Sequence, residues 1–201
     1  QLKTALSTNV DAIKTGMLPT VEIIHTAAEA IDSSGLEKVV IDPVLVCKGE
    51  DEALFPENVE AIVKSLLPRA LVVTPNLFEA GQLSGLGTLT TIDDMKRAAA
   101  KIHEAGAKNV VIKGGKQLQH DKAVDLFFNG STYTLLESEK TATTYNHGAG
   151  CTFAAAVTAN LANGLAVNES IIEAKKFVSA AIANGWKLNE YVGPVMHGAK
   201  N

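Results

Sequence analysis

Short apolar runs alternate with amphipathic windows along most of the chain. Four runs rich in β-branched residues predict strands, and each is followed within two residues by glycine or proline: 10–14, 38–42, 71–74 and 110–113. The windows between them have apolar residues at helical spacing. The first of these runs from Pro19-Thr20 to Gly35, with one expected apolar face made by Val21, Ile23, Ile24, Ala27, Ala28 and Ile31. Strands that are apolar throughout, with helices between them, predict an α/β fold whose mostly parallel sheet is covered on both faces.

The pattern changes in the second half of the chain. Residues 123–128 and 131–136 flank Asn129-Gly130, a strong signal for a β-hairpin. Two long helices are predicted after it, at about 149–163 and 169–184, and each ends in Asn-Gly, a common helix stop. No repeat or low-complexity linker interrupts the chain, so we expect a single domain over residues 1–201.

Composition narrows the class of protein. The 201 residues are 46% hydrophobic, enough for one domain with a sizeable core, and the net charge of −4 favours neither a nucleic-acid nor a membrane partner. There is no bilayer-length apolar run, no signal peptide and no pattern of cysteines for disulfides, which predicts a cytoplasmic protein. Residues 1–6 resemble the end of a helix and lack an initial methionine, so we expect a natural N-terminal segment to precede them.

Polar residues follow each of the four predicted parallel strands. In open α/β sheets, ligands bind outside the carboxyl ends of the strands. The segments that reach this edge are Thr15-Gly16-Met17, Asp42-Pro43, Thr74-Pro75-Asn76 and Lys113-Gly114-Gly115. Their convergence predicts a ligand site at that edge.

The strongest local motif joins a polar loop to the first long C-terminal helix, at residues 146–152 (NHGAGCT). Glycines entering a helix present free backbone N–H groups and the positive end of the helix dipole, which suits the charge on a transferring phosphoryl group. Thiols in the first turn of a helix lose their proton readily, so Cys151 could act as a base or nucleophile. The equally weighted alternative is a glycine turn followed by a buried cysteine. His147 could contact a substrate or brace the loop.

Several other polar residues admit two interpretations. Asn76 and Glu79 could be a helix-capping pair, or could hold the water shell of Mg²⁺ near phosphates. Asp42 could form a turn before proline, or organise metal and phosphate. Lys113 could be solvated at a strand end, or could pair with phosphates. Cys47 and Lys48 lie in a predicted loop, which could be an ordinary turn or could meet the substrate.

Common nucleotide and metal motifs are absent. No Gly-Lys pair is followed by serine or threonine, and no dinucleotide-type glycine fingerprint follows a strand. These absences exclude two common nucleotide-binding folds, but they do not exclude ATP. The histidines show no metal-ligand spacing.

Five motifs, taken in order, resemble the ribokinase-like superfamily, and within it the phosphomethylpyrimidine kinase and pyridoxal kinase branch. They span essentially the whole chain: 14–18 (KTGML), 42–44 (DPV), 74–79 (TPNLFE), 113–115 (KGG) and 147–152 (HGAGCT). The resemblance implies a three-layer α/β fold, an ATP- and Mg²⁺-dependent kinase, and a homodimer. It also implies that Cys151 takes the place of the aspartate base found in most of the superfamily.

The resemblance assigns the remaining roles residue by residue. Gly148, Ala149 and Gly150 match the anion hole, while Asn76, Lys113 and Gly115 fall on the ATP site. Asp42 and Glu79 belong to the ATP site and would also organise the metal. Substrate contacts fall on four residues: Met17, Cys47, Lys48 and His147.

Two segments favour B6 vitamers as substrates, namely 44–49 (VLVCKG) and 189–194 (NEYVGP). The reaction implied is phosphorylation of the hydroxymethyl group of pyridoxal, pyridoxine or pyridoxamine, and Cys47 could add reversibly to the aldehyde of pyridoxal. Family members begin with a strand and a Gly-Gly loop that should precede Gln1. Two alternatives stay open: a hydroxymethylpyrimidine and phosphomethylpyrimidine kinase, and an inactive nucleotide-binding fragment.

Overall fold

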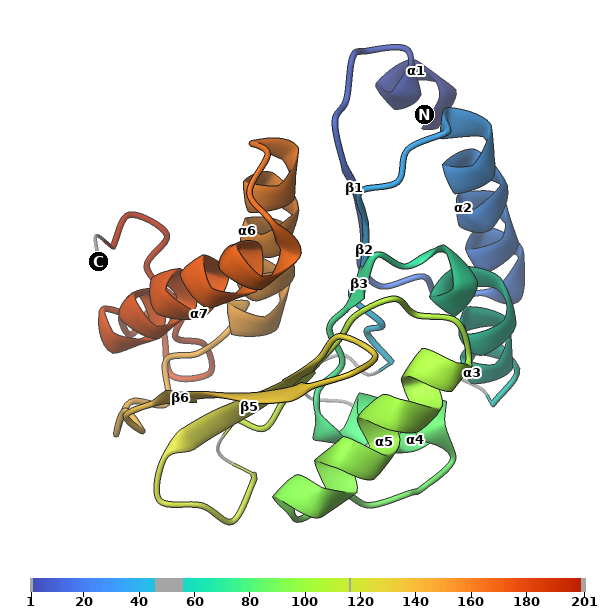
Figure 1. Cartoon of the computed structure of the whole chain (residues 1–201). Helices are drawn as coiled ribbons and strands as arrows, with labels where there is room; N and C mark the ends of the chain where they lie inside the picture. The colour runs from blue at the N-terminus through green and yellow to red at the C-terminus, as the bar shows by residue number, and fades with distance from the viewer. Residues whose placement is uncertain (1, 46–55, 116, 200–201) are drawn as a thin grey trace.

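The structure is a computed structural model and describes residues 2–45, 56–115 and 117–199 (Figure 1). Its centre is a six-stranded sheet in which spatial order follows chain order. The strands are β1 (Ile13–Thr15), β2 (Val39–Ile41), β3 (Val72–Val73), β4 (Val110–Lys113), β5 (Ala123–Phe128) and β6 (Tyr133–Ser138). Strands β1 to β4 pair in parallel, whereas β5 pairs antiparallel with both β4 and β6. The predicted mixed sheet and its hairpin are confirmed.

Helices cover both faces of the sheet (Figure 1). One layer contains α2 (Val21–Ser34), α3 (Pro56–Ala61), α4 (Leu77–Ser84) and α5 (Ile92–Glu104). The other contains α6 (Ala149–Ala162) and α7 (Val167–Ala183), while the short α1 (Leu2–Leu6) lies beside α2. Strands β1 to β4 are neighbours both in the chain and in the sheet. Right-handed crossovers between such parallel strands all place their helices on the same face, which explains the first layer. No helix in the described ranges is long and apolar enough to cross a membrane.

Side chains of the inner strands alternate between two cores. Val39 and Ile41 belong to the cluster under α2–α5, whereas Val40 between them packs in the cluster under α6 and α7. In β4, Val110 and Ile112 face the first layer and Val111 faces the second. Strands β2 and β3 are therefore apolar at every position, and β4 is apolar up to Lys113, because each face of the sheet meets its own helix layer.

Local capping signals fix several helix ends as predicted. Thr20 Oγ1 accepts a hydrogen bond from the Ile23 N–H at the start of α2, and Gly35 ends that helix with a φ of 66°. Thr91 and Asp94 form the capping box of α5. The backbone N–H of Thr90, together with Arg97 and Thr91, holds the pKa of Asp94 well below its ordinary value.

Other details differ from the sequence expectation. The buried stripe of α2 runs through Ile24, Ala28 and Ile31. Ile23 lies outside this stripe and is 42% exposed. The first strand begins at Ile13, and α7 begins at Val167, where the Ala166 N–H donates to Glu169. After α3 the chain continues as a π-helical turn (Ile62–Leu66) and a 3₁₀ turn (Leu67–Arg69).

Candidate active site

A polar cluster lies at the carboxyl ends of the parallel strands, on the sheet face that packs against α6. Lys14, Asp42, Thr74 and Lys113 share the alternation of the inward residues of that face, which include Val40, Val72 and Val111. Strand geometry alone therefore brings two lysines, a carboxylate and a hydroxyl from four strands onto one surface.

Asp42 is the centre of this cluster and is only 1% exposed. Its Oδ1 accepts hydrogen bonds from Lys113 Nζ at 3.2 Å and from Thr74 Oγ1 at 3.3 Å. Its Oδ2 lies 3.7 Å from Lys14 Nζ and has no hydrogen-bond partner among the described residues. A buried carboxylate oxygen with an unused lone pair is a natural place for a further donor or for metal-bound water.

Glu79 and Asn76 form a capping box at the start of α4. Glu79 Oε2 accepts from the Asn76 N–H at 2.7 Å, and Asn76 Oδ1 accepts from the Glu79 N–H at 2.8 Å. Burial raises the pKa of Glu79 above its ordinary value, an effect that Lys113 opposes and Asp42 reinforces. The capping interpretation is confirmed, and these electrostatic neighbours place Glu79 within the same charged cluster.

The raised pKa of Glu79 gives a pH-dependent contribution to stability. Between the ordinary value of 4.5 and the raised value, the folded state binds more protons than the unfolded state, so the free energy of unfolding falls as pH rises. Glu79→Gln lacks this titration, so we expect its stability relative to wild type to increase between pH 4 and 7. Denaturant unfolding across that range measures the difference, with Glu104→Gln at an exposed position as the control. A difference that is flat or falls with pH would contradict the assignment.

The first turn of α6 faces the cluster across Lys113. Gly148 precedes the helix with a φ of 81°, a conformation that favours glycine. A Cβ placed on Gly150 would lie 3.2 Å from Lys113 Nζ, so this lysine reaches from β4 to the start of α6. Cys151 is an exposed free thiol, which makes the buried-cysteine alternative wrong. The helix start, the thiol and the lysine can therefore serve one transferring group.

The C-terminal segment holds the glycine loop in place. The His147 N–H donates to the Gly193 carbonyl at 3.0 Å, and the Val195 N–H donates to the His147 carbonyl at 3.2 Å. Thr152 Oγ1 donates to the Gly148 carbonyl at 2.8 Å and lies 3.0 Å from His197 Nε2. The backbone of His147 thus braces the loop, as one of its two interpretations required, while its exposed side chain is available to a ligand.

The predicted site residues lie in different places relative to the cluster. Met17 is 37% exposed just after β1, and Gly115 has a φ of 55° in the turn after β4. Cys47 and Lys48 lie outside the described residues. Sequence reasoning gave no individual role to Lys14 or Thr74, although both stand at the ends of predicted strands, on the same sheet face as Asp42 and Lys113. That shared strand position is the signal that could have identified them.

The described residues could hold magnesium through a small number of direct protein ligands. Among the described residues there is no group of three or more His, Cys, Asp or Glu side chains that could hold a metal. Magnesium bound with a nucleotide, however, commonly uses one or two carboxylates and keeps several waters. The unused Oδ2 of Asp42 and the neighbouring Glu79 suit that arrangement.

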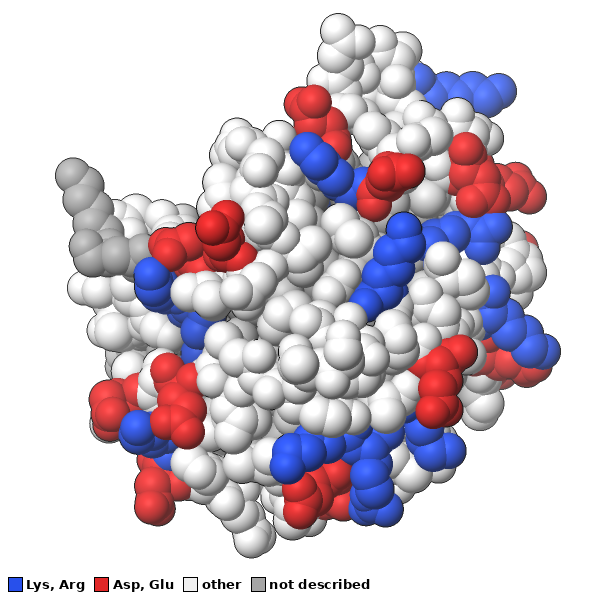
Figure 2. Space-filling model, viewed as in Figure 1, with Lys and Arg blue, Asp and Glu red and all other residues white. Residues whose placement is uncertain are grey.

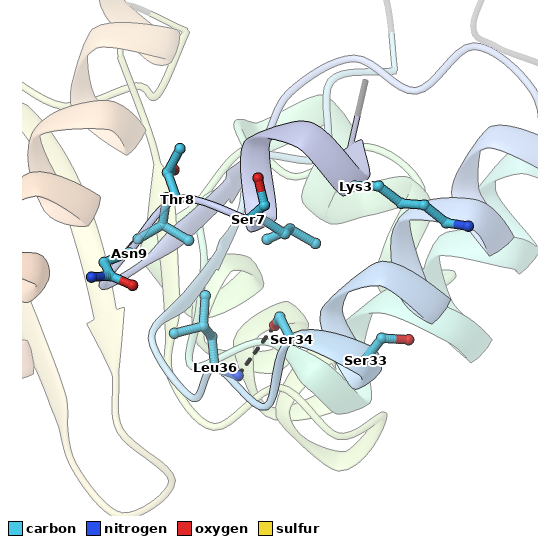
Figure 3. Close-up of a pocket in the computed structure, with 9 residues that line it drawn as sticks. Lys3, Ser7, Thr8, Asn9, Ser33, Ser34 and Leu36 are labelled. Atoms are coloured by element: carbon cyan, nitrogen blue, oxygen red, sulfur yellow. Dashed lines mark hydrogen bonds between the residues drawn. The ribbon is translucent and has the colours of Figure 1, made fainter.

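The pocket drawn in Figure 3 is a different feature. It lies between α1 and the end of α2, has a volume of about 460 Å³, and is lined mainly by polar residues such as Lys3, Ser7 and Ser33. None of the predicted site residues lines it. Charges of both signs are interspersed over the face shown in Figure 2, so this face carries no basic stripe.

The fold and the cluster are those of a phosphoryl-transfer enzyme of the α/β kinase class, in which a glycine-led helix start faces lysines at the strand ends. The chain belongs to the phosphomethylpyrimidine kinase family, which matches residues 1–196.

Similar proteins support this family assignment. The pyridoxine kinase of Bacillus subtilis (strain 168) is 58% identical over 190 residues, covering 94% of this chain and 70% of the relative. The pyridoxal kinase from Staphylococcus aureus in complex with AMP-PCP is 60% identical with a TM-score of 0.95, over 100% of this chain and 73% of that chain. Its complex with pyridoxal has 58% identity and a TM-score of 0.94, over 99% and 72%.

Proposed function

We propose that this protein transfers the γ-phosphoryl group of ATP to the hydroxymethyl group of pyridoxal and related B6 vitamers. The observation that carries the proposal is the exposed Cys151 thiol in the first turn of α6, with Lys113 Nζ reaching that turn at Gly150. Similar proteins from Staphylococcus aureus bind an ATP analogue and pyridoxal. We take the whole chain to act as a single kinase domain, because one sheet carries all the described site residues.

In the proposed reaction, Cys151 accepts the proton of the substrate hydroxyl. The hydroxyl oxygen then forms a bond to the γ-phosphorus while the bond between that phosphorus and the β–γ bridging oxygen breaks, releasing ADP. The N–H groups of residues 148–151 hold the charge that develops on the phosphoryl oxygens. Lys113 offsets part of the same charge from the sheet side.

The remaining residues would bind and orient the reactants. Asp42 and Glu79, with Asn76, would hold magnesium through its water shell, and the bound ion would neutralise phosphate charge. Gly115 would approach the nucleotide at the turn after β4. Met17 and His147 are exposed and would contact the vitamin ring, together with Cys47 and Lys48.

A direct comparison of acceptors tests the function. We expect the chain, supplied with ATP and Mg²⁺, to phosphorylate pyridoxal with a higher kcat/KM than hydroxymethylpyrimidine. The family name favours the pyrimidine as the second candidate. Better turnover of the pyrimidine, and of its monophosphate, would replace the B6 assignment with the thiamine-pathway one. Binding of ATP without turnover of either acceptor would support the inactive alternative.

The expected homodimer and cytoplasmic location are also part of the proposal. Light scattering on a size-exclusion column gives the mass in solution, for comparison with the 21.1 kDa of one chain. A mass of one chain at working concentration would contradict the dimer.

A further inference from the structure

Charged side chains alternate in sign across the sheet and into α7. The row begins with Lys14 and Asp42 and continues through Lys113, Asp125 and Lys175. Lys14, Asp42 and Lys113 belong to the site already described. Asp125 and Lys175 have no role in the proposed reaction.

Two aspartates compete as partners for Lys113 on this face of the sheet. Asp125 is its direct partner across the antiparallel β4–β5 pair, so both side chains lie on the same face of the sheet. Side chains in such pairs have Cβ atoms about 5 Å apart, close enough for a lysine and an aspartate to form an ion pair. The Lys113 ammonium nevertheless bonds Asp42, two strands away in the sheet.

The carboxylate of Asp125 is already occupied on both oxygens. Its Oδ2 accepts from Lys175 Nζ at 2.8 Å, and its Oδ1 accepts from the Gly114 N–H at 3.1 Å. The side chains of Lys175 and Asp125 are 14% and 10% exposed, so water screens this pair weakly. A cation supplied by α7 therefore neutralises the carboxylate that would otherwise attract Lys113.

We propose that Lys175 is a positioning residue for phosphoryl transfer, because it neutralises Asp125 and so leaves Lys113 directed at Asp42 and the first turn of α6. This inference rests on the proposed function, in which Lys113 offsets phosphate charge. Without the Lys175 ammonium, Asp125 would be a buried, uncompensated anion adjacent to Lys113. Lys113 would then turn toward its cross-strand neighbour and away from the phosphates.

The proposal predicts an asymmetry between the two members of the pair. Lys175→Met leaves the competing carboxylate in place, so Lys113 is diverted and affinity for ATP falls. Asp125→Asn removes the competitor, and the asparagine oxygen can still accept from the Gly114 N–H. A pair that only joins α7 to the sheet would lose the same contact in either variant.

Titration calorimetry with ATP and Mg²⁺ tests this without requiring a phosphoryl acceptor. We expect Lys175→Met to weaken ATP binding and to lower any turnover by about a hundredfold, as misplacement of a charged group near the reacting atoms can do. We expect Asp125→Asn in the Lys175→Met background to restore most of both, and Lys175→Arg to behave like wild type. Lys176→Met is the matched control, because it removes an exposed ion pair with Glu173 from the neighbouring position of α7.

The outcomes separate the inference from the proposed function. Equal losses in Lys175→Met and Asp125→Asn, or no recovery in the double variant, would overturn the positioning role. Thermal unfolding of each variant shows whether a loss of affinity merely follows a loss of stability, which would also overturn it. If wild type binds ATP but phosphorylates no B6 vitamer, the proposed function fails, and the binding data still decide the role of Lys175.

Discussion

The Cys151→Ala variant is expected to lose phosphoryl transfer while it still binds ATP. The thiol is exposed at the start of α6, and a positioned base of this kind contributes about 10²–10⁴-fold to rate. Alanine keeps the helix turn and its N–H groups, so the anion site should persist. Steady-state kinetics with pyridoxal, and calorimetry with ATP, measure the two properties separately.

Two further variants sharpen this result. Cys151→Asp restores the kind of base found in most of the ribokinase-like superfamily, so we expect it to recover part of the rate and to shift its pH dependence. Thr158→Ala, a change farther along the same helix, is the control for general effects on α6. Turnover of Cys151→Ala close to that of wild type would refute the base assignment.

The Lys113→Met variant is expected to lose both activity and stability. Asp42 is almost fully buried and would lose its hydrogen bond from the Lys113 ammonium, and breaking such pairs costs about 3 kcal/mol or more. Lys14, at 3.7 Å from the other oxygen, would offset part of that loss. Because Lys113 also reaches the first turn of α6, its removal should lower kcat by about 10²–10³-fold, as removal of one stabilising donor typically does.

A matched control is available for this variant. Lys108 lies near the start of the same strand and is exposed, so Lys108→Met should change neither unfolding nor turnover. Denaturant unfolding and steady-state kinetics on the two variants give the comparison. A Lys113→Met enzyme with reduced stability but unchanged kcat would show that the lysine serves only to neutralise Asp42.

Local signals were sufficient to predict most of the fold. Thr20, Thr91 and Asn76 cap helices through contacts within three or four residues, so the sequence alone identifies those helix starts. The strand at Val110–Lys113 was predicted at its observed bounds, because a glycine follows it directly. The exposed position of Ile23 was not predicted, since the other apolar residues of the predicted face gave α2 a broader stripe than its partners cover.

The site required information that lies between distant segments. Asp42 and Lys113 were candidates separately, but the bond between them spans 71 residues, and the part played by Lys14 depends on the pairing of β1 with β2. Similarly, Asp125 and Lys175 carry no motif, and their pairing follows only from the register of β5 and the placement of α7. Whether Cys151 was buried or exposed also depended on what the rest of the chain places above the helix.

The order of the strands has a consequence for how the protein is made. Because spatial order follows chain order, each strand from β2 onward can pair with the one synthesised just before it, and the sheet can grow while the chain emerges from the ribosome. The face formed by Val40, Val72 and Val111 is covered only when α6 and α7 arrive. Until then the nascent chain displays an apolar surface to chaperones, and the same two helices that end this exposure also bring Cys151 and Lys175 to the sheet.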